Sequence, residues 1–167
     1  MGYNSVTMIR VSDQYVWNVV FSAFFMILII MGAIILETEA RIAYTELTLV
    51  DYTLVTLASW RLVRLFVYDA ITRFFREQFY DVKKVGRGYR LEKPKMGPRR
   101  TVADLLSCPW CFGVWATATV LFFYLLTPYA VFPVTLLALS AVATSLQIIM
   151  NLIGHNAERA KKQSELL

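Results

Sequence analysis

Charged residues are scarce in this chain. Asp, Glu, Lys and Arg make up 17% of its 167 residues, and 57% are hydrophobic, whereas about a quarter charged is usual for a soluble domain. The mean hydropathy is correspondingly high, at +0.52. This balance excludes an ordinary soluble globular domain and predicts an integral membrane protein.

Cysteine and histidine are nearly absent. The chain has two cysteines, Cys108 and Cys111, and one histidine, His155. Two cysteines three positions apart do not form the disulfide framework of a small secreted protein. A tetrahedral zinc site needs four ligands, and one chain offers only these three residues and Asp104. A complete site would therefore require zinc shared across a dimer, with one cysteine pair from each subunit.

Four apolar segments have about the length that crosses a bilayer, ~20 residues. The first, Val16–Leu36, carries no charge and is longer than a signal-peptide core of ~7–15 residues, so we interpret it as a retained anchor. The second begins near Leu47. The third and fourth cover about Leu105–Leu126 and Phe132–Ile153, and the fourth stops at Gly154. The sequence predicts an all-α, multi-pass transmembrane helical bundle with four spans.

The two ends of the second span carry polar residues. Thr48 and Asp51 have the spacing of a capping pair at its start. Arg61 and Arg64 lie near its other end, where they can extend along their aliphatic stems toward water. Alternatively they point inward and pair with Asp69 or an anionic head group, because charge inside a membrane is costly without a partner.

Beyond Tyr68 the pattern is that of an amphipathic helix lying in the cytoplasmic interface. Asp69, Arg73 and Glu77 are spaced to form two i,i+4 ion pairs on its polar side. The following segment, 81–100, is basic, and its glycines and prolines break any long helix. We predict a basic cytoplasmic loop there that touches lipid. The apolar side of the helix consists of Val67, Ile71, Phe75 and Phe79.

The basic residues indicate an orientation. Ten Lys and Arg residues lie between the second and third spans and three more lie in the tail, whereas Arg41 is the basic residue of the opposite side. By the positive-inside rule, both termini and the loop are cytoplasmic and the protein resides in the plasma (inner) membrane. Basic residues beside apolar spans indicate contact with anionic lipid head groups rather than with nucleic acid.

In this orientation, polar residues of three spans come to a similar depth near the cytoplasmic face. We predict that they form one polar layer, and we interpret His155 as a solvated or lipid-facing residue of the tail rather than a ligand. Small residues on the third and fourth spans favour close helix packing. The predicted layer, with the residues that pack beside it, comprises Arg61, Arg64, Asp69, Arg76, Cys108, Cys111, Gly113, Trp115, Gln147 and Asn151.

The Cys108-Pro109-Trp110-Cys111 motif has three interpretations. The one we favour is structural, with small, soft side chains packing at the start of a helix. A redox dithiol is the second, because the positive end of a helix stabilises a thiolate, but the strand of a thioredoxin-type fold is missing from the sequence. Metal binding by the cysteines of two subunits is the third.

Two segments, LASWRLVRLFVYDAITRFFRE and LLSCPWCFGVW, together carry a resemblance. They resemble the YjcA-like family of bacterial sporulation and phage membrane proteins (DUF1360), which is uncharacterised. The similarity covers about Leu47 to His155 and leaves the first span outside. It implies a small integral membrane protein and supplies no established activity. The residues that match the family pattern are Arg61, Arg64, Leu65, Asp69, Arg76, Cys108, Cys111, Gly113 and Trp115.

We therefore predict three regions: an anchor span with a short acidic external loop (1–46), a family-like membrane domain (47–155) and a basic cytoplasmic tail (156–167). The expected function is that of a non-catalytic membrane interaction or scaffold protein, in contact with anionic lipid, a cytoplasmic or membrane protein partner, or further copies of itself. The first alternative is a thiol-redox or metal-responsive protein that uses the cysteine motif. The second is a holin-like pore, which we rank last because the first span offers only Asn18 and Ser22 as polar residues.

Overall fold

The computed structural model describes residues 4–86 and 88–165, and most of these residues are helical, in agreement with the predicted fold class. Its longer helices are α1 (Asn4–Glu39), α2 (Leu49–Val67), α4 (Pro98–Ser107), α5 (Pro109–Leu126) and α6 (Val131–Glu165). The short elements are η1 (Tyr44–Glu46), η2 (Ala70–Thr72), α3 (Arg73–Glu77), β1 (Asp81–Val85), β2 (Gly88–Glu92) and η3 (Pro128–Ala130).

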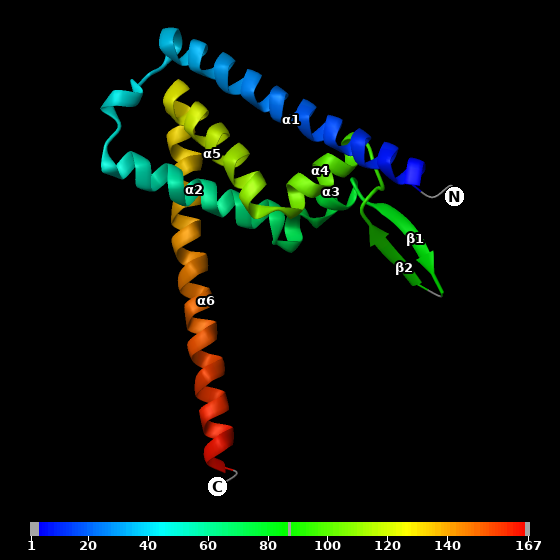
Figure 1. Cartoon of the computed structure of the whole chain (residues 1–167). Helices are drawn as coiled ribbons and strands as arrows, with labels where there is room; N and C mark the ends of the chain where they lie inside the picture. The colour runs from blue at the N-terminus through cyan, green and yellow to red at the C-terminus, as the bar shows by residue number, and fades with distance from the viewer. Residues whose placement is uncertain (1–3, 87, 166–167) are drawn as a thin grey trace.

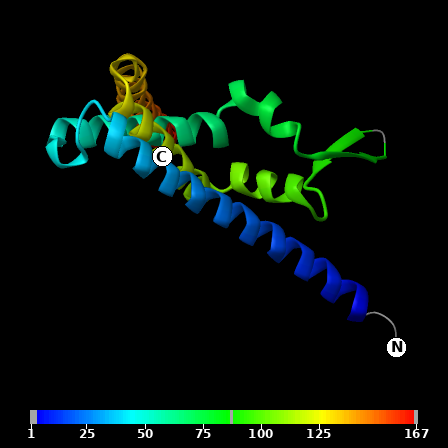
Figure 2. The ribbon, with the colours of Figure 1, turned by 90° about the horizontal axis from the view of Figure 1, so that it is seen from above.

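The helices pack around α2 and α5. Helix α2 contacts both α5 and α6, while α1 runs beside α5 and α4 on the other side (Figures 1 and 2). Helix α6 crosses α2, and its C-terminal half then extends away from the other elements (Figure 1). From residue 146 onward its described side chains are all exposed. The contacts of α6 with the other helices are therefore made by its N-terminal half.

Within the described residues, three helical segments are long and apolar enough to cross a membrane: Gln14–Glu39, Pro109–Leu126 and Pro128–Ser164. They correspond to the first, third and fourth spans predicted from the sequence. Helix α2 has 19 residues, but two arginines and an aspartate lower its hydropathy. Its role as a further span therefore stays a prediction.

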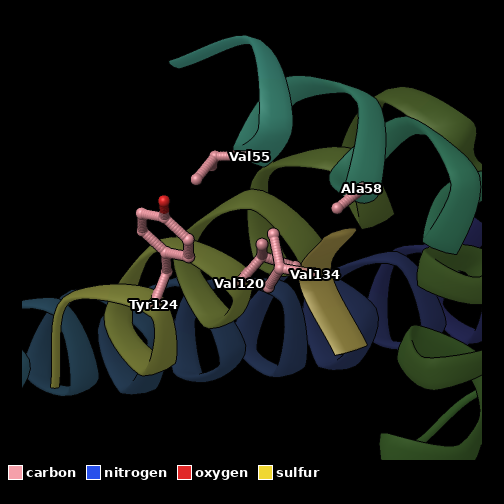
Figure 3. Close-up of a cluster of buried hydrophobic side chains, with 5 residues drawn as sticks. All are labelled: Val55, Ala58, Val120, Tyr124 and Val134. Atoms are coloured by element: carbon pink, nitrogen blue, oxygen red, sulfur yellow. The ribbon is translucent and has the colours of Figure 1, made fainter. Parts of the chain in front are cut away.

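A small apolar core joins the three central helices. The aromatic ring of Tyr124 packs toward the aliphatic side chains that α2 and α6 contribute (Figure 3). Its hydroxyl donates a hydrogen bond of 2.5 Å to the Asp51 carboxylate, which anchors the start of α2 on α5. The residues of this core are Val55, Ala58, Val120, Tyr124 and Val134.

The predicted capping pair at the start of α2 is confirmed. The Thr48 hydroxyl accepts a hydrogen bond from the Asp51 amide, and the Asp51 carboxylate accepts one of 2.8 Å from the Thr48 amide. Each of these bonds satisfies an amide that the first turn of a helix otherwise leaves unpaired.

The predicted amphipathic helix beyond Tyr68 does not continue from α2. Asp69 is extended (φ −71°, ψ 147°), and the chain re-enters helical conformation only in the two short elements η2 and α3. At this break the side chain of Asp69 turns back and pairs with Arg61 on α2. Of the two predicted i,i+4 pairs, Arg73 with Glu77 is confirmed, and Asp69 pairs with Arg61 instead of Arg73.

Segment 81–100 is not the irregular loop we predicted. Residues Asp81–Val85 and Gly88–Glu92 form an antiparallel hairpin, and α4 begins directly afterward at Pro98. Gly86 lies in the turn with φ +61°, a conformation that glycine adopts at no steric cost. A glycine in the two-residue turn between alternating strands is the usual hairpin signal, which our interpretation of these glycines as helix breakers overlooked.

The predicted end of the fourth apolar helix is wrong. Helix α6 does not stop at Gly154 but continues to Glu165. A glycine inside a helix costs only about 1 kcal/mol relative to alanine, and the residues that follow it are rich in Ala, Glu, Lys and Arg, which favour helix. The predicted start at Leu105 is also wrong for the third span, because the chain breaks at Cys108 between α4 and α5.

Candidate functional site

A polar cluster closes the end of α2, and we call Arg61, Asp69, Thr72, Arg76 and Ser140 the α2-end cluster. Arg61 donates from Nη1 to the Asp69 carboxylate at 2.8 Å and from Nε to the Ser140 hydroxyl at 2.9 Å. The side chains of Arg61 and Asp69 are only 16% and 26% exposed. Of the two sequence-based alternatives for Arg61, the structure therefore supports inward pairing.

Two further members of the cluster bind the last carbonyl groups of α2. The Arg76 guanidinium donates to the Phe66 carbonyl at 2.9 Å, and the Thr72 hydroxyl donates to the Leu65 carbonyl. The last turn of a helix leaves such carbonyls without a partner from the helix itself. Arg76 and Thr72 thus hold the chain reversal after α2 in place, a structural role that the sequence pattern did not specify.

Arg64 differs from Arg61 in its surroundings. Its Nε atom is buried and has no hydrogen-bond partner within residues 4–86 and 88–165. Gly113 on α5 faces the neighbouring part of α2, because a Cβ atom at this glycine would come 3.7 Å from the Val63 side chain. The second arginine of the motif therefore lies on a helix that packs closely against α5, without an ion pair like that of Arg61.

The two cysteines occupy the junction of α4 and α5. Cys108 is the N-cap of α5, its sulfur accepts a hydrogen bond of 3.2 Å from the Cys111 amide, and Pro109 follows as the first helical residue. The two sulfurs are joined in a disulfide. Cys111 is exposed and Cys108 is half-buried. The predicted position of the two cysteines at the start of a helix is therefore confirmed. The disulfide between them was not predicted.

A pocket of about 640 Å³, lined in part by this disulfide, lies between α1 and the α4–α5 junction. We call it the disulfide pocket. Its polar part includes Asn18, Lys93 and Ser107, and its apolar part includes Phe25 and Trp115. The rings of Phe25 and Trp115 are in contact, with their centroids 4.5 Å apart. Both cysteines and an amphipathic wall therefore face one space.

Lys93 links the base of the hairpin to α4 beside the cysteines. Its ammonium donates to the Asp104 carboxylate at 2.8 Å and to the Ser107 hydroxyl at 2.6 Å. Burial raises the pKa of Asp104, but the hydrogen bonds from Lys93 and Arg100 outweigh it, so the net pKa lies below its ordinary value. This carboxylate therefore stays ionised at neutral pH and fixes the lysine next to Ser107.

The predicted polar layer is divided in the structure. Gln147 and Asn151 lie on the exposed half of α6 and bond to each other at 3.1 Å. His155, which follows on the same helix, is exposed and lies 3.9 Å from Glu158. Among the residues that the structure describes, no three His, Cys, Asp or Glu side chains are grouped so as to hold a metal ion.

The hairpin presents a basic and apolar surface. Lys83 faces Arg90 across the strands, and Lys84 faces Tyr89. The hydrogen bond from Lys83 lowers the pKa of Glu92, which pairs with it at the base of the hairpin. Tyr89, Val82 and Leu91, which lie on one face of the hairpin, are exposed. The predicted basic segment is thus an ordered surface rather than a loose linker.

Ser140, Thr72 and Lys93 were absent from the sequence-based set of site residues. Ser140 and Thr72 are ordinary polar residues in apolar surroundings, and their partners Arg61 and Leu65 are brought to them only by the fold. Lys93 was counted among the basic residues, but nothing in the sequence pairs it with Asp104. The glycines at 86 and 88 are the one signal that would have revealed the hairpin carrying Lys93 into place.

Comparison with known proteins gives three matches. The family model described as "Protein of unknown function (DUF1360)" matches residues 54–150. The UPF0713 protein YngL of Bacillus subtilis is 31% identical over 109 residues, which cover 65% of this chain and 82% of that protein. The sporulation protein YjcA of the same organism is 33% identical over 105 residues, covering 59% of this chain and 88% of that protein. No solved structure matches the chain.

Proposed function

Because this chain belongs to the DUF1360 family of proteins of unknown function, we propose that it is a multi-pass inner-membrane protein that acts by interaction and not by catalysis. In this proposal α2 is a fourth span, and both termini and the hairpin face the cytoplasm. The distribution of Lys and Arg supports this orientation. One relative is named a sporulation protein, so sporulation is the first process in which to look for a phenotype.

The observation that carries the proposal is the composition of the hairpin. Lysine and arginine side chains alternate there with exposed Val82, Tyr89 and Leu91. Aromatic and aliphatic side chains of this kind enter the head-group region, while basic residues near an anionic membrane surface each contribute about 1 kcal/mol. The hairpin is therefore suited to rest on anionic lipid, where it would offer its other face to a protein partner.

The α2-end cluster supports this role by holding the segment that leads into the hairpin, and Arg99 holds the hairpin base itself. Arg61 joins α2 to Asp69 and to Ser140 on α6, and Arg76 joins α3 to the end of α2. Arg99, at the start of α4, bonds to Asp81 at the first residue of the hairpin. These contacts connect the hairpin to the apolar helices on both of its sides, so that its orientation follows that of the spans.

A dye at the hairpin tip tests the proposal. Tyr89→Cys in a Cys108→Ser, Cys111→Ser background is labelled with an environment-sensitive fluorophore, and the protein is placed in nanodiscs with increasing phosphatidylglycerol. We expect the emission to rise and shift to the blue with anionic lipid and to revert in high salt, since salt screens surface charge.

The matched control adds Lys84→Glu and Arg90→Glu, which remove the basic residues nearest to the dye without touching the α2-end cluster. The response to phosphatidylglycerol should then be lost. Emission that is the same in neutral and anionic nanodiscs before the charges are changed would contradict the proposed contact with lipid.

A further inference from the structure

We infer that Cys108 and Cys111 form a reversible dithiol–disulfide site, which exchanges with a low-molecular-weight thiol through the disulfide pocket and uses Cys108 as its attacking sulfur. This inference goes beyond the interaction role. It rests on the proposed function in one respect only, the side of the membrane that the cysteines face.

The position of the cysteines in the chain sets the redox environment. They directly follow the basic hairpin and α4, and therefore lie on the basic side of the molecule. Cytoplasmic thiols keep most cysteines reduced, and the disulfides found there are usually transient, catalytic or redox-sensing. A disulfide at the cytoplasmic end of α5 is therefore expected to open and close rather than to serve as a permanent brace.

The local geometry distinguishes the two sulfurs. Cys108 is the N-cap of an 18-residue helix, and its Sγ accepts the Cys111 amide hydrogen bond at 3.2 Å. The positive end of a helix and a backbone donor both stabilise a thiolate. The Lys93 ammonium lines the same pocket and is bonded to Ser107, the residue before Cys108. Cys108 therefore has the surroundings of the nucleophile, and Cys111 those of the resolving thiol.

The disulfide pocket has the size of a small-molecule site. Its volume of about 640 Å³ falls in the usual range for small-molecule sites, roughly 300–1,000 Å³. Its apolar wall is partly formed by Phe25 on α1. Because α1 lies outside the region matched by the family model, this wall is supplied by the chain's own N-terminal helix.

Two molecules of the small thiol reduce the protein disulfide in two steps. In reduction, an incoming thiolate attacks the Cys108 sulfur, a mixed disulfide forms and Cys111 leaves as a thiolate that takes a proton. A second thiolate then attacks the small-molecule sulfur of the mixed disulfide, which releases a symmetrical disulfide and the Cys108 thiolate. Two electrons pass from the two thiols to the protein disulfide. Oxidation follows the same steps in reverse, with Cys108 attacking first.

Redox titration of the full-length protein in mild detergent tests the site. The protein is equilibrated with mixtures of reduced and oxidised glutathione, quenched with acid, and alkylated with a mass-tagged maleimide. We expect both the oxidised and the reduced form to be populated within the mixtures that span cytoplasmic conditions. A pair that remains wholly oxidised or wholly reduced in every mixture overturns the inference.

Single variants identify the attacking sulfur. In Cys111→Ser, oxidised glutathione should form a mixed disulfide on Cys108 at least tenfold faster than it does on Cys111 in Cys108→Ser. The same order should hold for alkylation, with the Cys108 rate reaching its plateau at lower pH. Equal rates and equal pH profiles in the two variants would overturn the assignment of Cys108.

Labelling in sealed vesicles separates this inference from the proposed orientation. A membrane-impermeant maleimide should reach the reduced cysteines in inverted vesicles and not in right-side-out ones. Labelling from the outer face alone overturns the orientation, and with it the cytoplasmic thiol as exchange partner. Labelling from the cytoplasmic face, together with a cysteine pair that stays wholly oxidised or wholly reduced in every glutathione mixture, overturns the redox site alone.

Discussion

Arg61 is the residue on which the end of α2 depends. Its guanidinium satisfies Asp69 and Ser140 at once, and these partners lie on two different elements. A lysine ammonium is a compact point charge without the planar fork of donors, so Lys is a poor substitute at such a position. The arginine therefore connects α2, the chain reversal and α6.

Arg61→Gln is expected to destabilise the protein by about 2–3 kcal/mol, since it leaves the largely buried Asp69 carboxylate without its charged partner. Thermal unfolding in detergent, followed by circular dichroism, measures this loss. The matched control is Arg73→Gln, because the Arg73–Glu77 pair is on the surface and surface pairs contribute at most about 1 kcal/mol. Equal losses in the two variants would argue against a connecting role for Arg61.

Lys93 and Lys95 form a second matched pair at the residue scale. Lys93 lines both the disulfide pocket and a second pocket beside the hairpin, whereas Lys95 lines the second pocket and is not among the lining residues of the disulfide pocket. Lys93→Gln in the Cys111→Ser background should slow alkylation of Cys108 severalfold at neutral pH, since it removes a positive charge near the thiolate. Lys95→Gln should leave the rate unchanged, and a similar slowing in both variants would mean that the effect is general.

The sequence predicted part of this residue-scale picture. The cost of a charge inside an apolar span was enough to suggest Asp69 as a partner of Arg61. The sequence did not reveal Ser140 as a partner of Arg61, because a hydroxyl 79 positions away acquires this role only when α6 crosses α2. It also grouped Gln147 with the arginines by depth along the chain, although the crossing point of the helices lies before that residue.

At the scale of elements, glycines act in opposite ways in the hairpin and in α6. Gly86 has φ +61° in the hairpin turn, where a side chain costs roughly 1–2 kcal/mol. Gly86→Ala should therefore weaken the β1–β2 pairing. Faster hydrogen exchange of the hairpin amides, with unchanged exchange in α5, would report this local loss. Unchanged exchange in the hairpin would contradict the turn geometry.

Gly154→Ala is expected to have the reverse effect. Gly154 lies inside α6, and a Cβ atom there would meet nothing within 4 Å. Alanine should stabilise the helix by about 1 kcal/mol, and hydrogen exchange of the amides around residue 154 should slow. If exchange instead became faster, the helix would have to end at Gly154 as the sequence suggested.

Helices were easier to predict than the other elements for a physical reason. An apolar run of about twenty residues leaves few alternatives to a helix in a membrane, so α1, α5 and the first part of α6 could be predicted. Hairpin formation depends on a two-residue turn and on cross-strand pairing, which composition does not reveal. The boundaries at Cys108 and Gly154 depended on weak local preferences that packing and neighbouring residues override.

At the scale of the whole molecule, the location of the two termini tests whether α2 spans the membrane. If α2 spans the membrane, both termini lie on the same side; if only the three candidate spans cross, the termini lie on opposite sides. We expect a fluorescent-protein fusion to be active at either end and an alkaline phosphatase fusion to be inactive at both, since both termini are proposed to be cytoplasmic. An active phosphatase fusion at one terminus would contradict the four-span arrangement.

The length of α6 sets a distance. Its 35 residues extend for about 52 Å at a rise of ~1.5 Å per residue, while a bilayer core needs only about 30 Å. The remaining part continues as a helix and not as a flexible tether, so it is a semi-rigid spacer. If α6 crosses the membrane, a molecule bound at its far end would be held about 20 Å from the edge of the hydrocarbon core.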